Sequence, residues 1–241
     1  MLATERLATP DQAPSGTPDA TPTMTSIAFF DLDHTLVDGD SDSSFLDFMA
    51  AHGALDGALL EGKGAIERAY LEGRAWQTEY GILLGKIYQG REVRGTEVLG
   101  HKHAHEKVLP MLFAGARSLI ESERAKGRSA VLLTTTNQVV TAPVAAALGM
   151  DALLCTRLEV DAARGEFTGR LEDGFCTGPG KAAAIESYCR QVGAVPADCA
   201  MFGDGRSDMD ALSIVGEPVA VHPFDRLRDV AETKGWRILA L

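Results

Sequence analysis

The sequence predicts an α/β protein in which helices flank a parallel β-sheet and a block of helices is inserted after the first strand. Two patterns support this prediction. From Met111 to the C-terminus, apolar segments of strand length alternate with segments of helical periodicity, which is typical of a parallel sheet. Between Ser43 and about Pro110, apolar residues recur at helical spacing and strand signals are scarce.

The first strand is predicted at residues 26–30, where an apolar run stops abruptly at Asp31. The helical block follows, with apolar residues gathered at 45–49 and again at 82–87. Beyond the block, the expected elements in chain order are helix 112–126, strand 129–133, helix 139–148, strand 152–156, hairpin 157–171, helix 181–192, strand 199–202, a short helix from 207, strand 218–221, helix 224–234 and strand 236–239.

The domain organisation follows from these elements. Residues 1–24 are rich in Ala, Thr and Pro and lack apolar periodicity, so we expect a disordered leader, with Met24 as a candidate native start. We expect a core formed by residues 25–41 and 109–241, and a helical cap formed by residues 42–108. A cap inserted at the carboxyl end of the first strand would act as a lid on a cleft there.

Composition excludes several classes of function. The formal net charge of −11 argues against a nucleic-acid binder, whose surface carries a basic face. The same charge repels anions at long range, so any phosphate site must be built locally. The four cysteines form no C-x-x-C pair, which fits neither a zinc site nor a disulfide scaffold. With no apolar stretch of membrane-spanning length and no secretory signal, we predict a cytoplasmic protein without membrane partners.

The segment Asp31-Leu-Asp-His-Thr35 indicates chemistry because it ends a buried strand on two carboxylates and a hydroxyl. Residues two apart on a strand point to the same side, so Asp31 and Asp33 can face one cleft. Two carboxylates at such a short separation repel each other unless a cation or a shared proton lies between them. Mg²⁺ is a hard cation that takes oxygen ligands. The alternative interpretation is an Asp-rich turn that caps a helix, for which Asp38-Gly-Asp-Ser-Asp42 is suited.

Three further segments place polar residues where strands end or helices begin. The run Val131-Leu-Leu-Thr-Thr-Thr-Asn137 ends a strand on hydroxyls, beside helix N–H groups that can hold an anion. Gly178-Pro-Gly-Lys181 places a lysine at a helix start, and Gly203-Asp204 precedes Asp208 in a turn after a strand. Each also has a structural explanation, as β-branched strand residues, a surface lysine and a helix N-terminal aspartate.

Together these segments resemble the motifs of the haloacid dehalogenase (HAD) superfamily of phosphatases, in matching order and context. The first is similar to its D-x-D-x-T motif, Thr134 to its strand-end Ser/Thr, Lys181 to its lysine, and Gly203-Asp204 with Asp208 to its G-D-x-x-x-D motif. The resemblance covers about residue 26 to the C-terminus and is strongest to the subgroup with phosphoserine phosphatases. It implies a Rossmann-like parallel sheet core, the HAD fold, with an inserted all-helical C1 cap.

The resemblance also implies a role for each motif residue in hydrolysing a phosphate ester. Asp31 would be the nucleophile that forms an aspartyl phosphate, and Asp33 the general acid and base. Mg²⁺, the implied cofactor, would be bound by Asp31, the Asp33 backbone carbonyl and Asp204. The remaining roles are phosphate binding by Thr134, the Thr135 N–H group and Lys181, and support of the site by Thr35 and Asp208.

Two departures from the phosphoserine phosphatase pattern leave the substrate open. The second motif has side chains at Thr135 and Thr136 where those enzymes have Gly-Gly, and Ser207 stands in place of their usual Asn. Asp40, nine residues after the nucleophile, matches the position of their hinge Glu, which meets the substrate ammonium. A carboxylate there favours a small polar, amine-bearing phosphate ester as the partner, with phosphoserine ahead of histidinol phosphate, and helix capping is the alternative role for Asp40.

Other functions remain open from the sequence. Within the same chemistry, the alternatives are a phosphotransferase and a lipid-phosphate phosphatase, and outside it an inactive binding module. The spacing of His101, His103 and His105 would allow a metal site, but we expect a solvated helix face. The sequence does not indicate the oligomeric state. It also does not indicate which cation of the cap would contact a second anionic group of a substrate; the candidates are Lys63, Arg68, Arg74, Lys86, Arg91 and Arg94.

Overall fold

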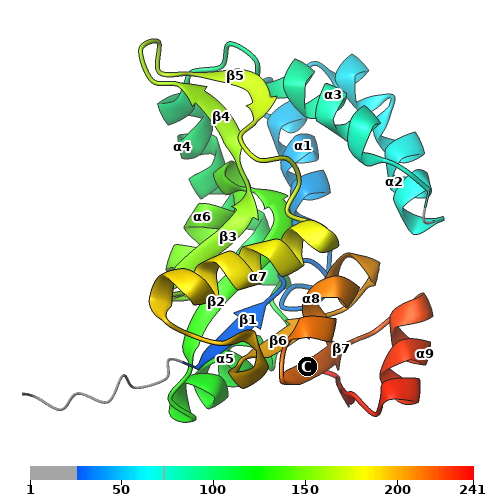
Figure 1. The fold of residues 1–241 in the computed structure, drawn as a ribbon. Helices are drawn as coiled ribbons and strands as arrows, with labels where there is room; N and C mark the ends of the chain where they lie inside the picture. Colours follow the sequence, from blue (N-terminus) through cyan, green and yellow to red (C-terminus); the bar gives the residue numbers. More distant parts are fainter. Residues whose placement is uncertain (1–25, 73) are drawn as a thin grey trace, which may run out of the picture.

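The computed structural model describes residues 26–72 and 74–241 (Figure 1). The predicted leader, residues 1–24, and the candidate start Met24 lie outside the described residues. Within the described part, no helix is long and apolar enough to cross a lipid bilayer.

The core is a six-stranded, fully parallel sheet with β1 near its middle, in the order β3-β2-β1-β6-β7-β8 (Figure 1). This confirms the predicted α/β class and the parallel sheet. The strands are β1 (Ile27–Phe30), β2 (Ser129–Asn137), β3 (Ala152–Thr156), β6 (Ala200–Gly203), β7 (Glu217–Val221) and β8 (Arg237–Leu239).

Helices cover both faces of the sheet, which explains why its central strands are apolar at successive positions. In β1, Ala28 and Phe30 pack on one side and Ile27 and Phe29 on the other, and all four are fully buried. The first side is covered by α5 (Ala116–Ala125) and α6 (Gln138–Ala147), and the second by α7 (Pro179–Val192), α8 (Met209–Ile214) and α9 (Asp225–Lys234).

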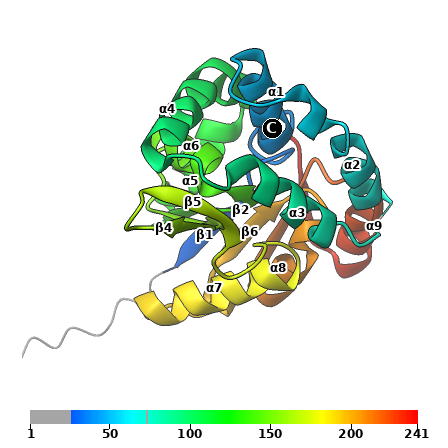
Figure 2. The same cartoon turned by 90° about the horizontal axis from the view of Figure 1, so that it is seen from above.

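The segment between β1 and β2 is helical as predicted, apart from short turns and irregular stretches. Seen from above, its helices lie over the edge of the core at which β1 ends (Figure 2). Their apolar residues, including Phe45 and Leu84, form a separate cluster from those on the sheet. The helices are α1 (Ser41–Ala51), α2 (Lys63–Leu71), α3 (Gln77–Tyr88) and α4 (Val93–His103), followed by short helical turns at Ala104–Val108 and Leu109–Met111.

The predicted hairpin is present as β4 (Leu158–Asp161) and β5 (Glu166–Leu171), which pair antiparallel and pack against α3. Its backbone bonds to the segment that joins α3 and α4. The Gly90 N–H donates to the Phe167 carbonyl, the Phe167 N–H to Arg91 and the Val93 N–H to Gly165, each at 2.9 Å. The hairpin thus fastens the inserted helices to the core.

Two element boundaries differ from the prediction by four residues. Helix α5 begins at Ala116 instead of residue 112, because Leu112 forms an antiparallel bridge to Val37 and Phe113 donates its N–H to the Leu36 carbonyl. Strand β2 continues to Asn137 instead of ending at residue 133, since Thr134 pairs with Cys155 of β3 and Asn137 with Thr156. This extension carries the threonine run beyond the end of β1.

Candidate active site

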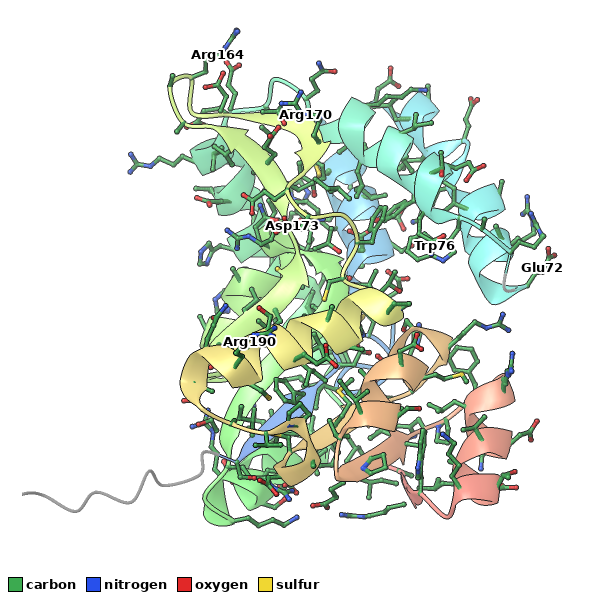
Figure 3. The ribbon with its side chains drawn as sticks, in the orientation of Figure 1. Glu72, Trp76, Arg164, Arg170, Asp173 and Arg190 are labelled. Carbon is green, nitrogen blue, oxygen red and sulfur yellow. The ribbon has the colours of Figure 1, made fainter. Side chains whose placement is uncertain are left out.

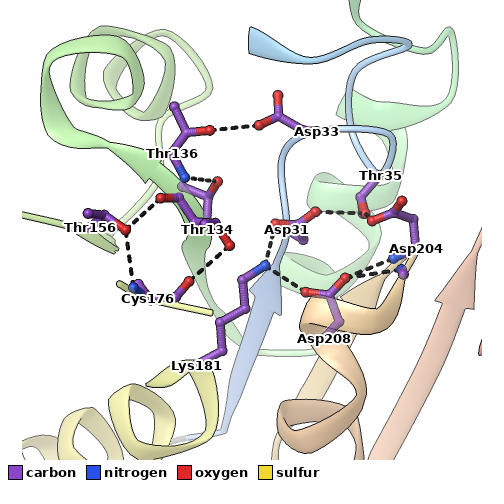
Figure 4. Close-up of polar contacts among 12 residues, drawn as sticks. Asp31, Asp33, Thr35, Thr134, Thr136, Thr156, Cys176, Lys181, Asp204 and Asp208 are labelled. Atoms are coloured by element: carbon purple, nitrogen blue, oxygen red, sulfur yellow. Dashed lines mark hydrogen bonds and ion pairs between the residues drawn. The ribbon is translucent and has the colours of Figure 1, made fainter. Parts of the chain in front are cut away.

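The candidate site lies at the carboxyl ends of β1 and β6, where the strand order reverses. The chain runs from β1 to β2 and β3 on one side, then returns to β6, β7 and β8 on the other. Connections diverge at such a point and leave a crevice above the sheet. Asp31 directly follows β1 and Asp204 directly follows β6, so the two aspartates meet there (Figure 4).

Lys181, in the first turn of α7, links two of the predicted aspartates. Its Nζ lies 2.6 Å from Asp31 Oδ1 and 2.6 Å from Asp208 Oδ1, and the side chain is 1% exposed (Figure 4). Burial alone would lower the pKa of Lys181, but the Asp208 and Asp31 carboxylates raise it well above its usual value. The lysine is therefore a fixed positive charge in a buried acidic cluster, and its interpretation as a surface charge is wrong.

Thr35 lies between the carboxylates of Asp31 and Asp204. Its hydroxyl is 3.2 Å from Asp31 Oδ2 and 3.3 Å from Asp204 Oδ1, so it can donate to either. The side chain of Thr35 is fully buried, and both aspartates are about 4% exposed. The last residue of the first motif thus holds together the two carboxylates that face each other across the crevice.

Asp208 is fixed by the backbone of the turn after β6. Its Oδ2 accepts the N–H groups of Asp204 at 3.1 Å and Gly205 at 3.3 Å. Gly203 permits this approach, because a Cβ at that position would lie 2.6 Å from Asp208 Cγ. The spacing between Asp204 and Asp208 is therefore explained, because the Asp208 carboxylate accepts hydrogen bonds from the backbone of the turn that precedes it.

Asp33 points away from this cluster and is held by the helical insertion and β2. Its Oδ1 accepts the Ser41 N–H at 2.7 Å, and its Oδ2 accepts the Thr136 hydroxyl at 2.8 Å. Burial and the nearby Asp40 carboxylate raise the pKa of Asp33 to about 6. His34, with φ of 59°, occupies the left-handed region in the tight turn that separates the two aspartates from the rest of the motif.

The threonine run at the end of β2 forms one side of the crevice. Thr134 is 1% exposed, and its hydroxyl oxygen accepts the N–H of Thr136 at 3.2 Å. The Thr135 hydroxyl donates to the Cys176 carbonyl at 3.0 Å, in the segment that leads to α7. The run therefore connects β2 with both Asp33 and the segment before Lys181.

The acidic cluster fits a hard cation. Carboxylate oxygens of Asp31, Asp204 and Asp208 all lie within 4.8 Å of one another, and all three residues are buried. Burial raises the pKa of Asp31 to about 7, despite the opposing effect of Lys181, and raises that of Asp204 well above its usual value. One lysine does not balance three carboxylates, and oxygen donors of this kind suit Mg²⁺.

A pocket of about 150 Å³ lies above the cluster, between the strand ends and the inserted helices. Asp31, Asp33 and Asp204 line its floor, together with the threonine run. The family model of the haloacid dehalogenase-like hydrolases matches residues 28–213.

The chain belongs to the haloacid dehalogenase-like hydrolases. This confirms the predicted superfamily and the prediction of a hydrolase.

Curated proteins similar to this hydrolase carry phosphatase names. A phosphoserine phosphatase of Mycobacterium tuberculosis is 32% identical, over 89% of this chain and 70% of its own. A histidinol-phosphatase of Neisseria meningitidis serogroup C is 26% identical, over 90% of this chain and 99% of its own. These names describe the relatives, and two different substrates are represented among them.

Solved structures agree with the fold. A protein of unknown function from Bordetella pertussis Tohama I aligns with a TM-score of 0.80 at 28% identity, covering 90% of this chain and 99% of its own. A substrate-bound phosphoserine phosphatase complex aligns with a TM-score of 0.62 at 17% identity, covering 85% of this chain and 90% of its own. The second likeness, at that identity, supports the HAD fold alone.

Thr136 and Asp42 also line the pocket of the candidate site, although no motif in the sequence assigns them a role. Thr136 bonds to Asp33, and the hydroxyl-rich run that contains it was the signal for this contact. Asp42 lines the pocket and accepts the side-chain amide of Asn137 at 3.2 Å. That contact joins α1 to the end of β2, and no spacing in the sequence indicates it.

Asp40 lies at the edge of the same pocket and also caps α1. Its side chain accepts the Ser43 N–H at 2.7 Å, which is the capping alternative predicted from the sequence. A contact of Asp40 with substrate stays a prediction.

The prediction that the three histidines face solvent is confirmed for His101 and His105, which are exposed. It is wrong for His103. His103 is fully buried, with Nε2 3.0 Å from the Ser44 hydroxyl. Its position is explained by the packing of α4 on α1, which buries the face of α4 that carries His103.

Proposed function

We propose that this hydrolase is a Mg²⁺-dependent phosphomonoesterase that works through an aspartyl phosphate on Asp31. The observation that supports this most strongly is the placement of the Asp31 carboxylate on the pocket floor, between Lys181 and Asp204. Phosphatase names among the curated relatives support the same chemistry. In the proposal, the helices of residues 42–108 serve as the cap that covers the phosphate.

In the proposed reaction, a carboxylate oxygen of Asp31 attacks phosphorus and the ester oxygen leaves with the proton of Asp33. Water then attacks the aspartyl phosphate and gives a proton back to Asp33, which releases phosphate and restores both carboxyl groups. A pKa of about 6 keeps a fraction of Asp33 protonated near neutral pH, as this role requires. The bonds from Ser41 and Thr136 orient its carboxyl group.

The phosphate oxygens would be bound by Thr134, the Thr135 N–H group and Lys181. Mg²⁺ would be held by Asp31, Asp204 and the Asp33 backbone carbonyl, with Asp208 and Thr35 in support. When bound, the ion supplies positive charge that offsets the repulsion between the Asp31 carboxylate and a phosphate dianion.

Replacement of the nucleophile tests this proposal. We expect Asp31→Asn to lower kcat for p-nitrophenyl phosphate by more than about a thousandfold, because an amide does not form the aspartyl phosphate. Asp38→Asn, at an exposed carboxylate outside the pocket lining, is the matched control and should keep wild-type activity. Full activity of Asp31→Asn would disprove the mechanism, and an inactive wild-type protein would favour a binding module.

Removal of the metal tests the cofactor. We expect EDTA to abolish turnover of p-nitrophenyl phosphate and added Mg²⁺ to restore it, because Lys181 alone does not neutralise the acidic cluster. Turnover that persists after exhaustive chelation and dialysis would contradict a Mg²⁺ requirement. In the same assay, release of free phosphate without an acceptor alcohol would count against a phosphotransferase.

A small, polar, amine-bearing phosphate ester is the proposed substrate class. A pocket of about 150 Å³ suits a small metabolite, and its carboxylates suit an ammonium group. Phosphoserine and histidinol phosphate both fit this class, and each is represented in the names of relatives.

A further inference from the structure

The part of the pocket that the inserted helices line differs in chemistry from its floor. It is formed by α1, α2 and the start of α3, and it combines carboxylates with apolar and aromatic side chains. The lining residues there include Asp42, Leu46, Lys63, Ile66, Trp76 and Tyr80.

Asp42 is a fixed carboxylate in this part of the pocket. It lies in the first turn of α1, where the Asn137 amide donates to its Oδ1 at 3.2 Å, and Asn137 in turn contacts the Tyr88 hydroxyl at 3.3 Å. Burial, together with the Asp40 and Asp33 carboxylates, raises the pKa of Asp42 well above its usual value. A cation beside Asp42 would oppose this shift and favour the ionised carboxylate.

Lys63 is the lone lysine or arginine among the described residues that line the pocket, and its charge is already partnered. Its Nζ donates to the Ser43 carbonyl at 3.1 Å and to Asp47 at 3.2 Å. The carboxylates of the lining are Asp31, Asp33, Asp40, Asp42 and Asp204, of which Asp31 is already paired with Lys181 beneath the floor. A carboxylate on a substrate would be repelled here, whereas an ammonium would be attracted.

An aromatic group joins the inserted helices to the core beside this acidic part of the pocket. Trp76 lies on the side of the helical layer that faces the core (Figure 3). Its ring centroid is 5.3 Å from that of Phe175, which precedes α7, and 5.7 Å from that of Tyr80. Trp76 and Tyr80 also line the pocket, so they offer apolar ring surface to a bound molecule.

We propose that the substrate is the phosphate ester of an amino alcohol that lacks a carboxylate and carries a flat or apolar group, with its ammonium bound by Asp42. The flat or apolar group lies against Trp76 and Tyr80. This inference rests on the proposed phosphatase function and narrows its substrate class. It excludes phosphoserine as the preferred substrate, because phosphoserine brings a carboxylate beside its ammonium.

Matched phosphate esters test each part of the inference through kcat/KM. Phosphoethanolamine and phosphoserine differ by the carboxylate, and phosphoethanolamine and ethyl phosphate differ by the ammonium. We expect phosphoethanolamine to exceed each partner by about tenfold or more, given the usual strength of charged hydrogen bonds. Histidinol phosphate adds a flat ring to phosphoethanolamine, and we expect it to exceed phosphoethanolamine by about tenfold.

A variant of Asp42 tests the residue itself. In Asp42→Asn, the ratio of kcat/KM for phosphoethanolamine over ethyl phosphate should fall toward one, mainly through KM, whereas Asp38→Asn should keep the wild-type ratio. Circular dichroism verifies that the variant is folded, and the comparisons on the wild-type enzyme need no variant.

The outcomes separate the two proposals. Turnover of p-nitrophenyl phosphate combined with equal or better turnover of phosphoserine than of phosphoethanolamine would overturn this inference alone. If a folded Asp42→Asn variant kept the wild-type ratio of kcat/KM for phosphoethanolamine over ethyl phosphate, the binding of the ammonium by Asp42 would be disproved. No hydrolysis of any ester in the presence of Mg²⁺ would overturn the proposed function together with this inference.

Discussion

Lys181 is the residue on which the charge balance of the described site depends. Its ammonium lies 2.6 Å from two buried carboxylates, which would otherwise face each other without a cation from the protein. A buried ion pair adds little net stability when both partners are present, because desolvation opposes the attraction. Loss of one partner is costly, because it leaves buried charge without compensation.

A substitution at Lys181 therefore affects stability as well as phosphate binding. In Mg²⁺-free buffer, we expect Lys181→Met to lower the free energy of unfolding by about 3 to 5 kcal/mol, which chemical denaturation can measure. Lys86→Met, at an exposed lysine of α3, is the matched control and should change it by less than about 0.5 kcal/mol. Equal stability of Lys181→Met and wild type would contradict the charge-balance argument.

Among the elements, α4 packs on α1 through a buried histidine. His103 contacts Ser44, and its ring lies 5.2 Å from that of Phe45 and 5.4 Å from that of Phe48. Its Nδ1 has no hydrogen-bond partner among the described residues. Burial, and to a lesser extent the charge of the nearby Lys107, lowers the pKa of His103 to about 4. The ring is therefore neutral in the folded protein near neutral pH.

This packing predicts a stability that depends on pH. Because the folded pKa lies below the unfolded value of about 6.5, the unfolded chain binds the proton more readily, and stability present above pH 6.5 is lost as pH falls toward 4. Between pH 7 and pH 5, we expect His103 to contribute a loss of about 2 kcal/mol.

The measurement is denaturant unfolding of wild type and His103→Gln at both pH values. The difference between the two proteins isolates the histidine from the aspartates of the candidate site, whose raised pKa values act in the opposite direction. A pH dependence that is the same in both proteins would show that His103 titrates alike in the folded and unfolded chain.

At the scale of the whole molecule, the sequence predicts the layers of the fold well, because periodicity and burial are repeated over many residues. The alternation after Met111 specifies a parallel sheet, and the motif order places Asp31, Lys181 and Asp204 together. The end of β2 was harder to predict. The threonines after residue 133 are β-branched and fit a strand, but their hydroxyls also fit the polar turn that follows one.

Contacts between distant elements were not predictable from spacing. Two hydrogen bonds, between Asp42 and Asn137 and between Asp33 and Thr136, each join residues that are about a hundred positions apart and meet only through tertiary packing. The burial of His103 arises in the same way, because the pattern of α4 alone does not show which face meets α1. Asp33, Asp42 and Thr136 line the pocket, so part of its lining depends on contacts of this kind.

The backbone bonds between the β4–β5 hairpin and the segment after α3 restrict how a molecule reaches the pocket. Gly90 and Val93 are joined to the hairpin by main-chain hydrogen bonds, so that end of the helical layer is anchored beside the sheet. Rotation of the whole layer would break these bonds at each turnover. Entry of a substrate and departure of phosphate are therefore expected to use displacement of α2 and the start of α3, where Lys63 and Trp76 line the pocket.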